Sequence, residues 1–452
     1  MAASHQLPPG PRFPGLLQTF LIWRRWLWFL HWCRRRYGGT FKVKAMPMGD
    51  IVYVSDPEHI KQVFTGDRSL LHAGEANSFL GPVMGDRSLL LLDEDEHLSQ
   101  RKLMLPSFHG EAVRRYGEMV RSLTEEEVAR WPLGRAFPLL PAMQAITLEV
   151  ILRAVFGVEE RRRLADLRRL LPQVVMPDPV LQLMWMRPEL GRVGRWRKFL
   201  RLKEEMDGIL FDEIAQRRRD PGLEERTDVL SLLIRARADD GRTLTDVELR
   251  DQLVTLLLAG HETTATGLAW AFERLLRHPR ALERLRTETA AGDEAYADAV
   301  VKETLRVRPV IADVVRKLTA DADIAGYRLP AGTIVAPAIG LVHFDRDYYE
   351  EPGQFRPERF LEGNPDSYTW ISFGGGPRRC LGAAFASLEM RVVLTTVLER
   401  VELRAARPEP EEIRVSHITL VPEHGSEVVV ERVRDEAERG AEGAASLTAA
   451  AR

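Results

Sequence analysis

The sequence predicts a mostly α-helical single large domain with small β-sheets. Apolar residues recur at helical spacing over long stretches, as in residues 142–156 and 200–214. Short β-prone runs lie near both ends of the chain, within residues 41–54 and 324–430. Neither an internal repeat nor an interdomain linker separates these parts, so we expect the β-prone runs to meet across one domain.

The composition is that of an ordinary globular protein. The 452 residues are 45% hydrophobic and 29% charged, and the net charge of −2 gives no general attraction to nucleic acid. The two cysteines, Cys33 and Cys380, exclude a disulfide scaffold and fit a reducing compartment. We therefore expect a cytoplasmic protein that binds no nucleic acid.

Residues 1–40 are interpreted as an N-terminal amphipathic segment packed on the domain. Residues 16–32 are rich in aromatic side chains, but Arg24 and Arg25 interrupt the apolar run, so we expect no transmembrane anchor. Cys33 is then a packing residue. The alternative is a peripheral membrane foot, with the arginines at 34–36 near lipid headgroups.

Local signals define the first elements after this segment. Two β-prone runs, residues 41–45 and 51–54, predict a hairpin. The following helix has Asp56 as its N-cap, Pro57 at its first position and Gly66 past its end.

The pattern of residues 94–290 is mostly helical, with one interruption. Residues 172–188 combine several prolines with methionine, leucine and tryptophan. Such an apolar loop should not face water permanently, so it is either plain core or a mobile lid over an apolar pocket. The prolines favour the lid.

The last third of the chain mixes strands with one long helix. We expect a strand at 324–329, a turn at 330–332 and a strand at 333–336. A long helix covers residues 381–401, and a hairpin of 416–421 with 426–430 closes the domain. Residues 433–452, rich in Ala, Glu and Arg, predict a disordered tail.

The segment around Cys380 carries the most chemical information. Three glycines precede Cys380, which is expected at the start of a helix, where backbone N–H groups and Arg378 and Arg379 favour a thiolate. A nucleophile would need a nearby base, a redox thiol a resolving cysteine, and a phosphate cradle a Lys-Ser/Thr ending, none of which is local. Haem ligation by one thiolate needs no second cysteine.

This segment resembles the haem-binding loop of the cytochrome P450 family. The family pattern is Phe-x-x-Gly-x-Arg-x-Cys-x-Gly, and its fixed positions hold Phe373, Gly376, Arg378, Cys380 and Gly382. The resemblance covers nearly the whole chain. It implies the cytochrome P450 fold, a haem domain at residues 41–432, and haem b (iron protoporphyrin IX) as the cofactor, with Cys380 as the iron ligand.

A second motif lies midway along a long helix that opens with a Thr245-x-x-Glu248 capping box. In the run 259–264, hydroxyl and charged residues interrupt an apolar helix. One interpretation is that the hydroxyls donate hydrogen bonds to backbone carbonyls of the same helix. The other is that the run is a proton relay at a buried pocket, and the two interpretations are compatible. The family resemblance implies that Thr263 hydrogen-bonds the bound oxygen and that Glu262 passes protons. His261 receives no role.

Two further motifs resemble structural elements of the family. Glu303 and Arg306 share a helix face, and Arg359 lies in a Pro-Glu-Arg-Phe turn. Each alone would be an ordinary surface charge. The resemblance implies that the three form a buried charged network that holds the cysteine loop.

Haem propionates require cations near them. His97 and Arg101 are spaced to share one helix face, and Arg316 and Arg378 occupy family positions for propionate binding. Taken singly, each could instead be a surface charge.

The resemblance implies a monooxygenase that inserts one oxygen atom from O₂ into a lipophilic small molecule, such as a fatty acid, a terpenoid or another secondary metabolite. Residues 74–92, 172–186 and 310–315 are expected to shape its apolar pocket. We expect a monomer that receives electrons from a separate ferredoxin and ferredoxin reductase, with NADPH or NADH as the source. The alternatives are a peroxide-driven peroxygenase, a haem-thiolate isomerase and a non-enzymatic haem sensor. The Glu262-Thr263 pair weighs against all three.

Overall fold

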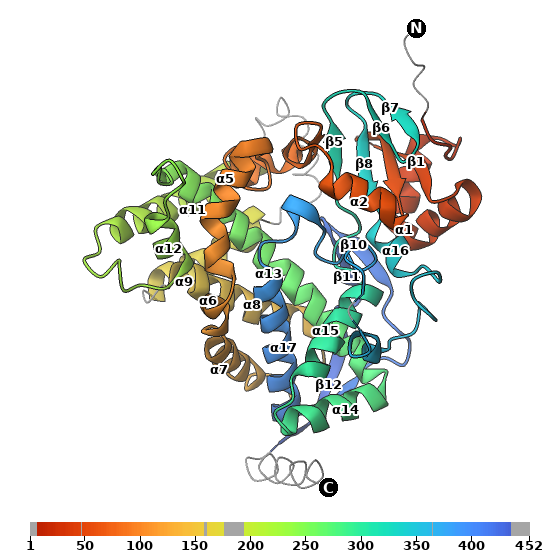
Figure 1. Cartoon of the computed structure of the whole chain (residues 1–452). Helices are drawn as coiled ribbons and strands as arrows, with labels where there is room; N and C mark the ends of the chain where they lie inside the picture. The colour runs from red at the N-terminus through yellow and green to blue at the C-terminus, as the bar shows by residue number, and fades with distance from the viewer. Residues whose placement is uncertain (1–6, 47, 158–160, 176–193, 364, 435–452) are drawn as a thin grey trace.

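The computed structural model describes residues 7–46, 48–157, 161–175, 194–363 and 365–434 (Figure 1). Most of the described chain is helical, and the strands form small sheets, so the predicted fold class is confirmed. The largest sheet lies with α1 and α2 at one side of the molecule, while helices occupy the other side and the centre (Figure 1).

The helices vary from single turns to one of more than eight turns. The α-helices are α1 (Gly15–Tyr37), α2 (Pro57–Thr65), α3 (Ala73–Ala76), α4 (Gly81–Met84), α5 (Glu94–Met104), α6 (Glu111–Arg114), α7 (Gly117–Val128), α8 (Leu139–Phe156), α9 (Arg161–Val175), α11 (Gly194–Arg218), α12 (Val229–Arg235), α13 (Asp246–Leu276), α14 (Pro279–Ala290), α15 (Ala295–Val307), α16 (Ile339–His343) and α17 (Ala383–Arg400). Short 3₁₀ helices are η1 (Ser78–Leu80), η2 (Leu105–Phe108), η4 (Pro357–Phe360) and η5 (Gly376–Arg378).

The strands are short. They are β1 (Thr40–Ala45), β2 (Gly49–Val54), β3 (Leu71–His72), β4 (Ala136–Pro138), β5 (Arg316–Leu318), β6 (Ala322–Ile324), β7 (Tyr327–Leu329), β8 (Ile334–Pro337), β9 (Val401–Ala405), β10 (Ile413–Ser416), β11 (Thr419–Pro422) and β12 (Glu427–Val433). The five-stranded sheet has the order β1-β2-β8-β5-β3, and β2 pairs in parallel with β8. Strands from both ends of the chain therefore meet, as expected.

The predicted N-terminal caps of α2 and α13 are confirmed. The Asp56 side chain accepts a hydrogen bond from the backbone N–H of Glu58 at 2.9 Å and so caps α2. At the start of α13, the Thr245 hydroxyl accepts from the Glu248 N–H at 3.2 Å, and the Glu248 carboxylate accepts from the Thr245 N–H at 2.8 Å. Both helices begin where the sequence predicts.

Two strand predictions were wrong. Residues 324–329 do not form one strand, because the chain turns at Ala325 (φ +53°) and Gly326 (φ +79°) and pairs β6 with β7. Strands β11 and β12 do not form a hairpin with each other. Instead, β11 pairs with β10, and β12 pairs with β9 and β4, because the strands at 401–405 and 413–416, which the prediction missed, are the available partners.

The expected lid and tail fall mostly outside the described residues. Residues 176–188 of the lid and 435–452 of the tail are among these. The described part of the lid segment, residues 172–175, belongs to helix α9 with Pro172 inside it, rather than to a loop. At the other end, β12 extends through Val433, the first residue of the expected tail.

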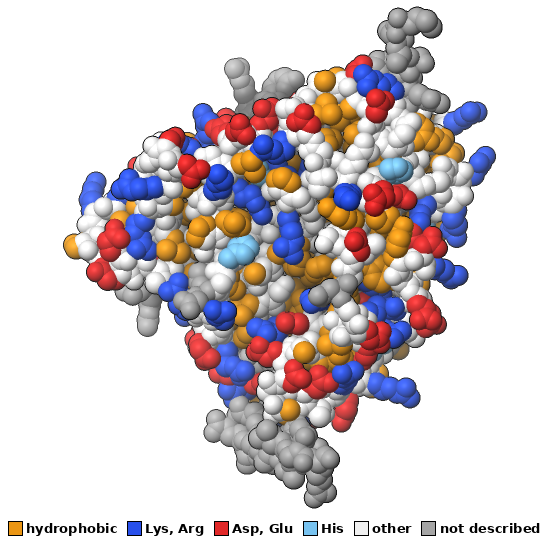
Figure 2. Space-filling model, in the orientation of Figure 1, with side chains coloured by type: hydrophobic (Ala, Val, Ile, Leu, Met, Phe, Trp, Pro, Cys, Tyr) orange, Lys and Arg blue, Asp and Glu red, His pale blue; other side chains and the backbone are white. Residues whose placement is uncertain are grey.

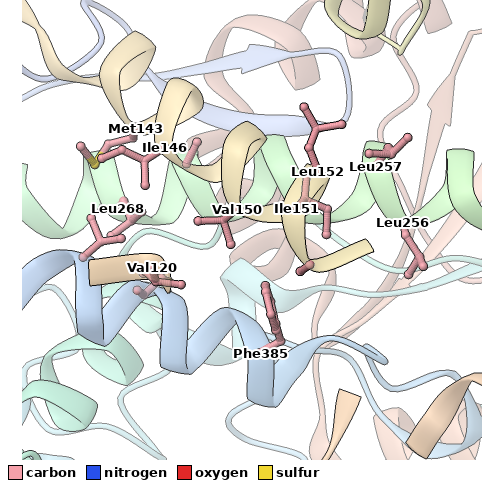
Figure 3. Close-up of a cluster of buried hydrophobic side chains, with 14 of the residues drawn as sticks. Val120, Met143, Ile146, Val150, Ile151, Leu152, Leu256, Leu257, Leu268 and Phe385 are labelled. Atoms are coloured by element: carbon pink, nitrogen blue, oxygen red, sulfur yellow. The ribbon is translucent and has the colours of Figure 1, made fainter. Parts of the chain in front are cut away.

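Helix α13 runs through the middle of the molecule and packs against α8 and α17 (Figure 1). Side chains of these helices fill the space between them, as Figure 3 shows for Val150, Leu268 and Phe385. Helix α8 is apolar and long enough to cross a membrane, but 61% of it is buried and it lies in this core. The packing holds the middle of α13, with residues 259–264, in a fixed place beside α17 and the loop before it.

Candidate active site

One cavity of about 590 Å³ is lined both by the middle of α13 and by the cysteine loop, residues 373–382. From α13 come Ala259, Gly260, Glu262 and Thr263, and from the loop comes Cys380. Much of the remaining lining is apolar and belongs to the stretches expected to shape a pocket, including Phe79, Leu80, Val83, Leu89, Val310, Ile311 and Val314. The site is thus a largely apolar chamber into which the Cys380 thiol, the Glu262 carboxyl and several hydroxyls, that of Thr263 among them, are brought together.

The cysteine loop is compact because glycines let it press against α2. The Cys380 N–H donates to the Phe373 carbonyl at 2.9 Å, which closes the loop. Gly376 has φ +61°, and a Cβ there would lie 2.0 Å from the Phe64 carbonyl oxygen. A Cβ on Gly375 would lie 2.2 Å from the Phe64 ring. A larger residue at either position would therefore displace the loop from α2 and shift Cys380.

The Cys380 side chain is exposed to the cavity, but its thiol is not ionised by its surroundings alone. Burial raises the pKa of Cys380, while the Gly382 N–H and the charges of Arg101 and Arg379 act in the opposite direction. Helix α17 begins only at Ala383, so Cys380 precedes the helix rather than starting it. The sequence analysis expected the helix start and nearby arginines to favour a thiolate, but it did not include the opposing effect of burial. A bound metal must displace the proton.

The α13 residues offer an acid beside a hydroxyl. The Thr263 hydroxyl donates to the Ala259 carbonyl at 2.6 Å, which leaves its oxygen free to accept. Glu262 accepts a hydrogen bond from the Thr419 hydroxyl of β11 at 3.1 Å. Burial raises the pKa of Glu262 to about 7, although the Thr419 bond lowers it. Glu262 can therefore hold or release a proton near neutral pH.

His261 precedes Glu262 in the sequence but is not part of the cavity wall. Its side chain is buried and does not line the cavity, and burial lowers its pKa to about 4. His261 is thus a packed neutral residue.

Four basic side chains gather at one part of the cavity lining: His97 and Arg101 from α5, Arg316 from β5, and Arg378 from the cysteine loop. Arg316 is 6% exposed, and burial lowers its pKa to about 10. Among the described residues, no carboxylate forms an ion pair with Arg101 or Arg316, whereas Arg378 pairs with Asp93. Buried cations without partners are costly, so this part of the cavity suits an anionic group. The two propionates of haem fit that requirement.

The charged network beside the loop is fully buried. Both Glu303 and Arg306 are 0% exposed, and two hydrogen bonds of 2.7 and 2.8 Å join the guanidinium to the carboxylate. Arg359 approaches Glu303 at 3.3 Å, and the Arg356 N–H donates to Glu303 at 2.9 Å. Arg306 also donates to three backbone carbonyls, of His343, Pro352 and Gln354. Every charge here is satisfied by several partners.

His343 connects this network to the cysteine loop, and sequence reasoning missed it. Its Nδ1 lies 3.2 Å from the Arg306 carbonyl, and its Nε2 lies 3.0 Å from the N–H of Ile371. Burial lowers the pKa of His343 to about 3, so the ring is neutral, donates from Nδ1 and accepts at Nε2. The Ile371 carbonyl in turn accepts from Gly374 at 2.9 Å. No local spacing links His343 to either motif, so no pattern could have identified it.

The residues expected at the site fall into two groups. Those that line the cavity are Glu262, Thr263, His97, Arg101, Arg316, Phe373, Arg378, Cys380 and Gly382. Gly376 lies against α2, and Glu303, Arg306 and Arg359 form the network outside the cavity. An open thiol, an apolar chamber and unmatched cations in one cavity fit haem bound through Cys380.

Comparisons with known proteins show the family of the chain. The family described as Cytochrome P450 matches residues 7–428. "Putative cytochrome P450 135B1" of Mycobacterium tuberculosis is 49% identical over 439 residues, covering 96% of this chain and 93% of that protein. "Putative cytochrome P450 135A1" of the same species is 43% identical over 422 residues, covering 93% and 94%.

Solved structures share the fold. A retinoic acid-bound cyanobacterial CYP120A1 has a TM-score of 0.80 at 24% identity and covers 95% of this chain and 100% of its own. The cytochrome P450DA heme domain has a TM-score of 0.81 at 22% identity and covers 97% and 100%. At such identities these structures bear on the fold alone.

The buried network gives a first prediction. In Glu303→Gln, Arg306 loses its buried counter-charge, which should cost about 3–5 kcal/mol and leave the cysteine loop unsupported. We expect haem content per mole of purified protein to fall sharply. Glu362→Gln, which removes an exposed partner of Arg356, is the control. Normal haem content in Glu303→Gln would show that the network does not support the loop.

The unmatched cations give a second prediction. Arg316→Gln removes a cavity cation, whereas Lys317→Gln changes its neighbour, which pairs with Glu75 outside the cavity. We expect haem to transfer to excess apomyoglobin faster from Arg316→Gln, by about tenfold for one charge-assisted hydrogen bond. Lys317→Gln should transfer haem at the wild-type rate. Equal rates for the two variants would contradict a propionate contact at Arg316.

Proposed function

The chain belongs to the cytochrome P450 family, and we propose that it is a haem-thiolate monooxygenase that inserts one oxygen atom from O₂ into a lipophilic small molecule. A fatty acid, a terpenoid or another secondary metabolite would suit the apolar lining. The family binds haem b, and in this proposal Cys380 would hold its iron. One observation carries the proposal: Cys380 and the Glu262-Thr263 pair line the same apolar cavity.

The chain's own groups are arranged to hold the cofactor. The Cys380 sulfur faces the cavity from a loop that Gly376 presses onto α2, and Arg101 and Arg316 can receive the propionates. Haem bound through a thiolate supplies O₂ activation and favours O–O cleavage. Supporting this assignment, the cations have no other anionic partner among the described residues.

Protons reach the reaction through α13 in this proposal. Glu262, with a pKa raised to about 7, gives up a proton from its carboxyl after leaving Thr419. The Thr263 hydroxyl accepts that hydrogen bond while it donates to the Ala259 carbonyl, and can pass a proton on by exchanging roles. The apolar walls limit the entry of bulk water, so in this proposal protons arrive through these two side chains rather than directly from solvent.

Electrons are proposed to come from a separate ferredoxin and ferredoxin reductase, supplied by NADPH or NADH. We place ferredoxin docking on the cysteine side of the domain, where Arg379 is exposed. We propose a cytoplasmic monomer. The Glu262-Thr263 pair disfavours a peroxide-driven peroxygenase, a haem-thiolate isomerase or a haem sensor, because none of these needs proton delivery to O₂.

Reconstitution tests the proposal. Lipophilic compounds are first screened for a spectral shift of the oxidised holoenzyme, which reports their entry beside the iron. The best compound is then incubated with NADPH, ferredoxin, ferredoxin reductase and ¹⁸O₂. We expect one labelled oxygen atom in the product. Product from hydrogen peroxide alone would indicate a peroxygenase, and a spectral shift without product in any arm would indicate a binding protein.

The pH dependence of the coupled reaction tests Glu262. A folded-state pKa of about 7 means that the carboxyl is protonated at pH 6 and ionised at pH 8, so product formed per NADPH consumed should fall across this range. Glu262→Gln cannot release a proton, so its turnover should drop by about 10²-fold and lose this pH dependence. Glu389→Gln, which replaces a buried carboxyl outside the cavity lining, is the control. An unchanged profile in Glu262→Gln would remove Glu262 from the relay.

A further inference from the structure

Helix α1 is kinked at Arg25 (φ −144°), and its apolar side chains are partly buried and partly exposed. Trp26, Phe29, Leu30 and Cys33 pack inward, on the side of β1. The outward side chains remain largely exposed: Leu16 is 72% exposed, Phe20 58% and Trp23 62%. Leu17 and Trp28 are also exposed. A cluster of this kind on a protein surface marks a contact site.

The apolar cluster continues onto the turn between β1 and β2. The Gln18 side chain accepts from the Lys44 N–H, and the Thr19 hydroxyl accepts from the Met46 N–H, both at 2.8 Å. Met46 and Met48 in this turn are exposed, and Met48 also lines the cavity. We call α1 together with Lys44, Met46 and Met48 the N-terminal surface.

The charge of this region is strongly one-sided. Residues 1–49 contain eight Lys or Arg and no Asp or Glu, and of these Arg25, Arg34 and Lys42 form ion pairs with Glu412, Asp345 and Asp50. Arg24, Arg35 and Lys44 are exposed and form no ion pair with any described residue. Figure 2 shows orange and blue side chains next to each other over the part of the molecule where α1 lies in Figure 1. An occupant that is both apolar and anionic would match this surface.

We propose that the N-terminal surface lies on an anionic lipid bilayer, with the exposed aromatic and aliphatic side chains at the level of the headgroups and the arginines against lipid phosphates. Tryptophan favours this boundary because its ring is apolar and its N–H is polar. Apolar burial and electrostatic attraction then act together, as they do for helices that lie in the plane of a membrane. A protein partner would need a surface that is equally apolar and acidic, which a bilayer supplies without a specific fold.

The position of Met48 adds a consequence that rests on the proposed function. Because the turn held by α1 reaches the cavity, a lipophilic substrate dissolved in the bilayer could pass from the lipid into the site without crossing water. Membrane binding itself does not depend on the proposed reaction. A result that contradicts lipid binding would therefore leave the proposed reaction standing, and the reverse also holds.

Vesicle sedimentation of the haem-loaded protein tests the proposal. Wild-type protein is mixed with vesicles of equimolar phosphatidylglycerol and phosphatidylcholine, and with phosphatidylcholine vesicles alone. We expect clear binding to the anionic vesicles, weaker binding to the neutral ones, and a decrease as salt is raised. Leu16→Ser/Phe20→Ser/Trp23→Ser should lower the partition coefficient by about 10²-fold.

Two further variants separate the contributions. Arg24→Gln/Arg25→Gln should weaken binding to anionic vesicles by about fivefold per arginine and leave binding to neutral vesicles nearly unchanged. Leu133→Ser/Val247→Ser removes apolar side chains that are 62% and 54% exposed elsewhere and should bind as wild type does. Each variant must retain the carbonmonoxy spectrum of the wild type, which shows that the haem domain is intact.

Other results would overturn the proposal. Wild-type protein that does not sediment with anionic vesicles, or a triple α1 variant that binds them as well as the wild type, would each contradict it. A wild-type dimer without lipid binding, converted to a monomer by the triple variant, would instead identify the N-terminal surface as a contact between copies of the chain.

Discussion

A fully buried ion pair is linked by hydrogen bonds to the loop that carries the Cys380 sulfur. Glu303 and Arg306 sit without water contact, so each would be costly alone, yet the carboxylate and the guanidinium are both surrounded by donors and acceptors. Through neutral His343 and the backbone of Ile371, the pair is connected to the first glycine of the loop. The loop is held from the other side by Phe64 of α2. Two distant parts of the chain thus fix one sulfur atom.

Burial in or beside the cavity disfavours the charged form of four ionisable groups near this sulfur. Burial raises the pKa of Cys380 and Glu262 and lowers those of Arg316 and His97, because low polarity disfavours charge of either sign. The consequences differ with position. At Glu262 the shift gives an acid that titrates near neutrality. At Arg316 it leaves a cation that an anionic cofactor would stabilise, and at Cys380 it leaves a thiol that a metal must deprotonate.

The sequence predicted those parts of the structure that depend on near neighbours. The cap of α2 by Asp56 and the capping box of α13 are interactions within a few residues, so they could be read directly. The cavity-lining residues were found because motifs mark them, although the motifs are far apart in sequence. Strand pairing failed where partners are distant, as in β9 with β12, and the role of His343 depends on contacts that no spacing encodes. The sequence of α1 could not show which of its many apolar side chains would be buried, because this depends on contacts with distant strands.

The carbonmonoxy spectrum of the reduced, haem-loaded protein tests the central claim most directly. If the Cys380 sulfur binds the iron, wild-type protein will show the red-shifted Soret band that thiolate ligation produces. Cys380→Ser, prepared in the same way, will lose that band, while Cys33→Ser, which alters a buried packing residue, will keep it. Haem-loaded wild-type protein without the band, or a band that persists in Cys380→Ser, would contradict the account.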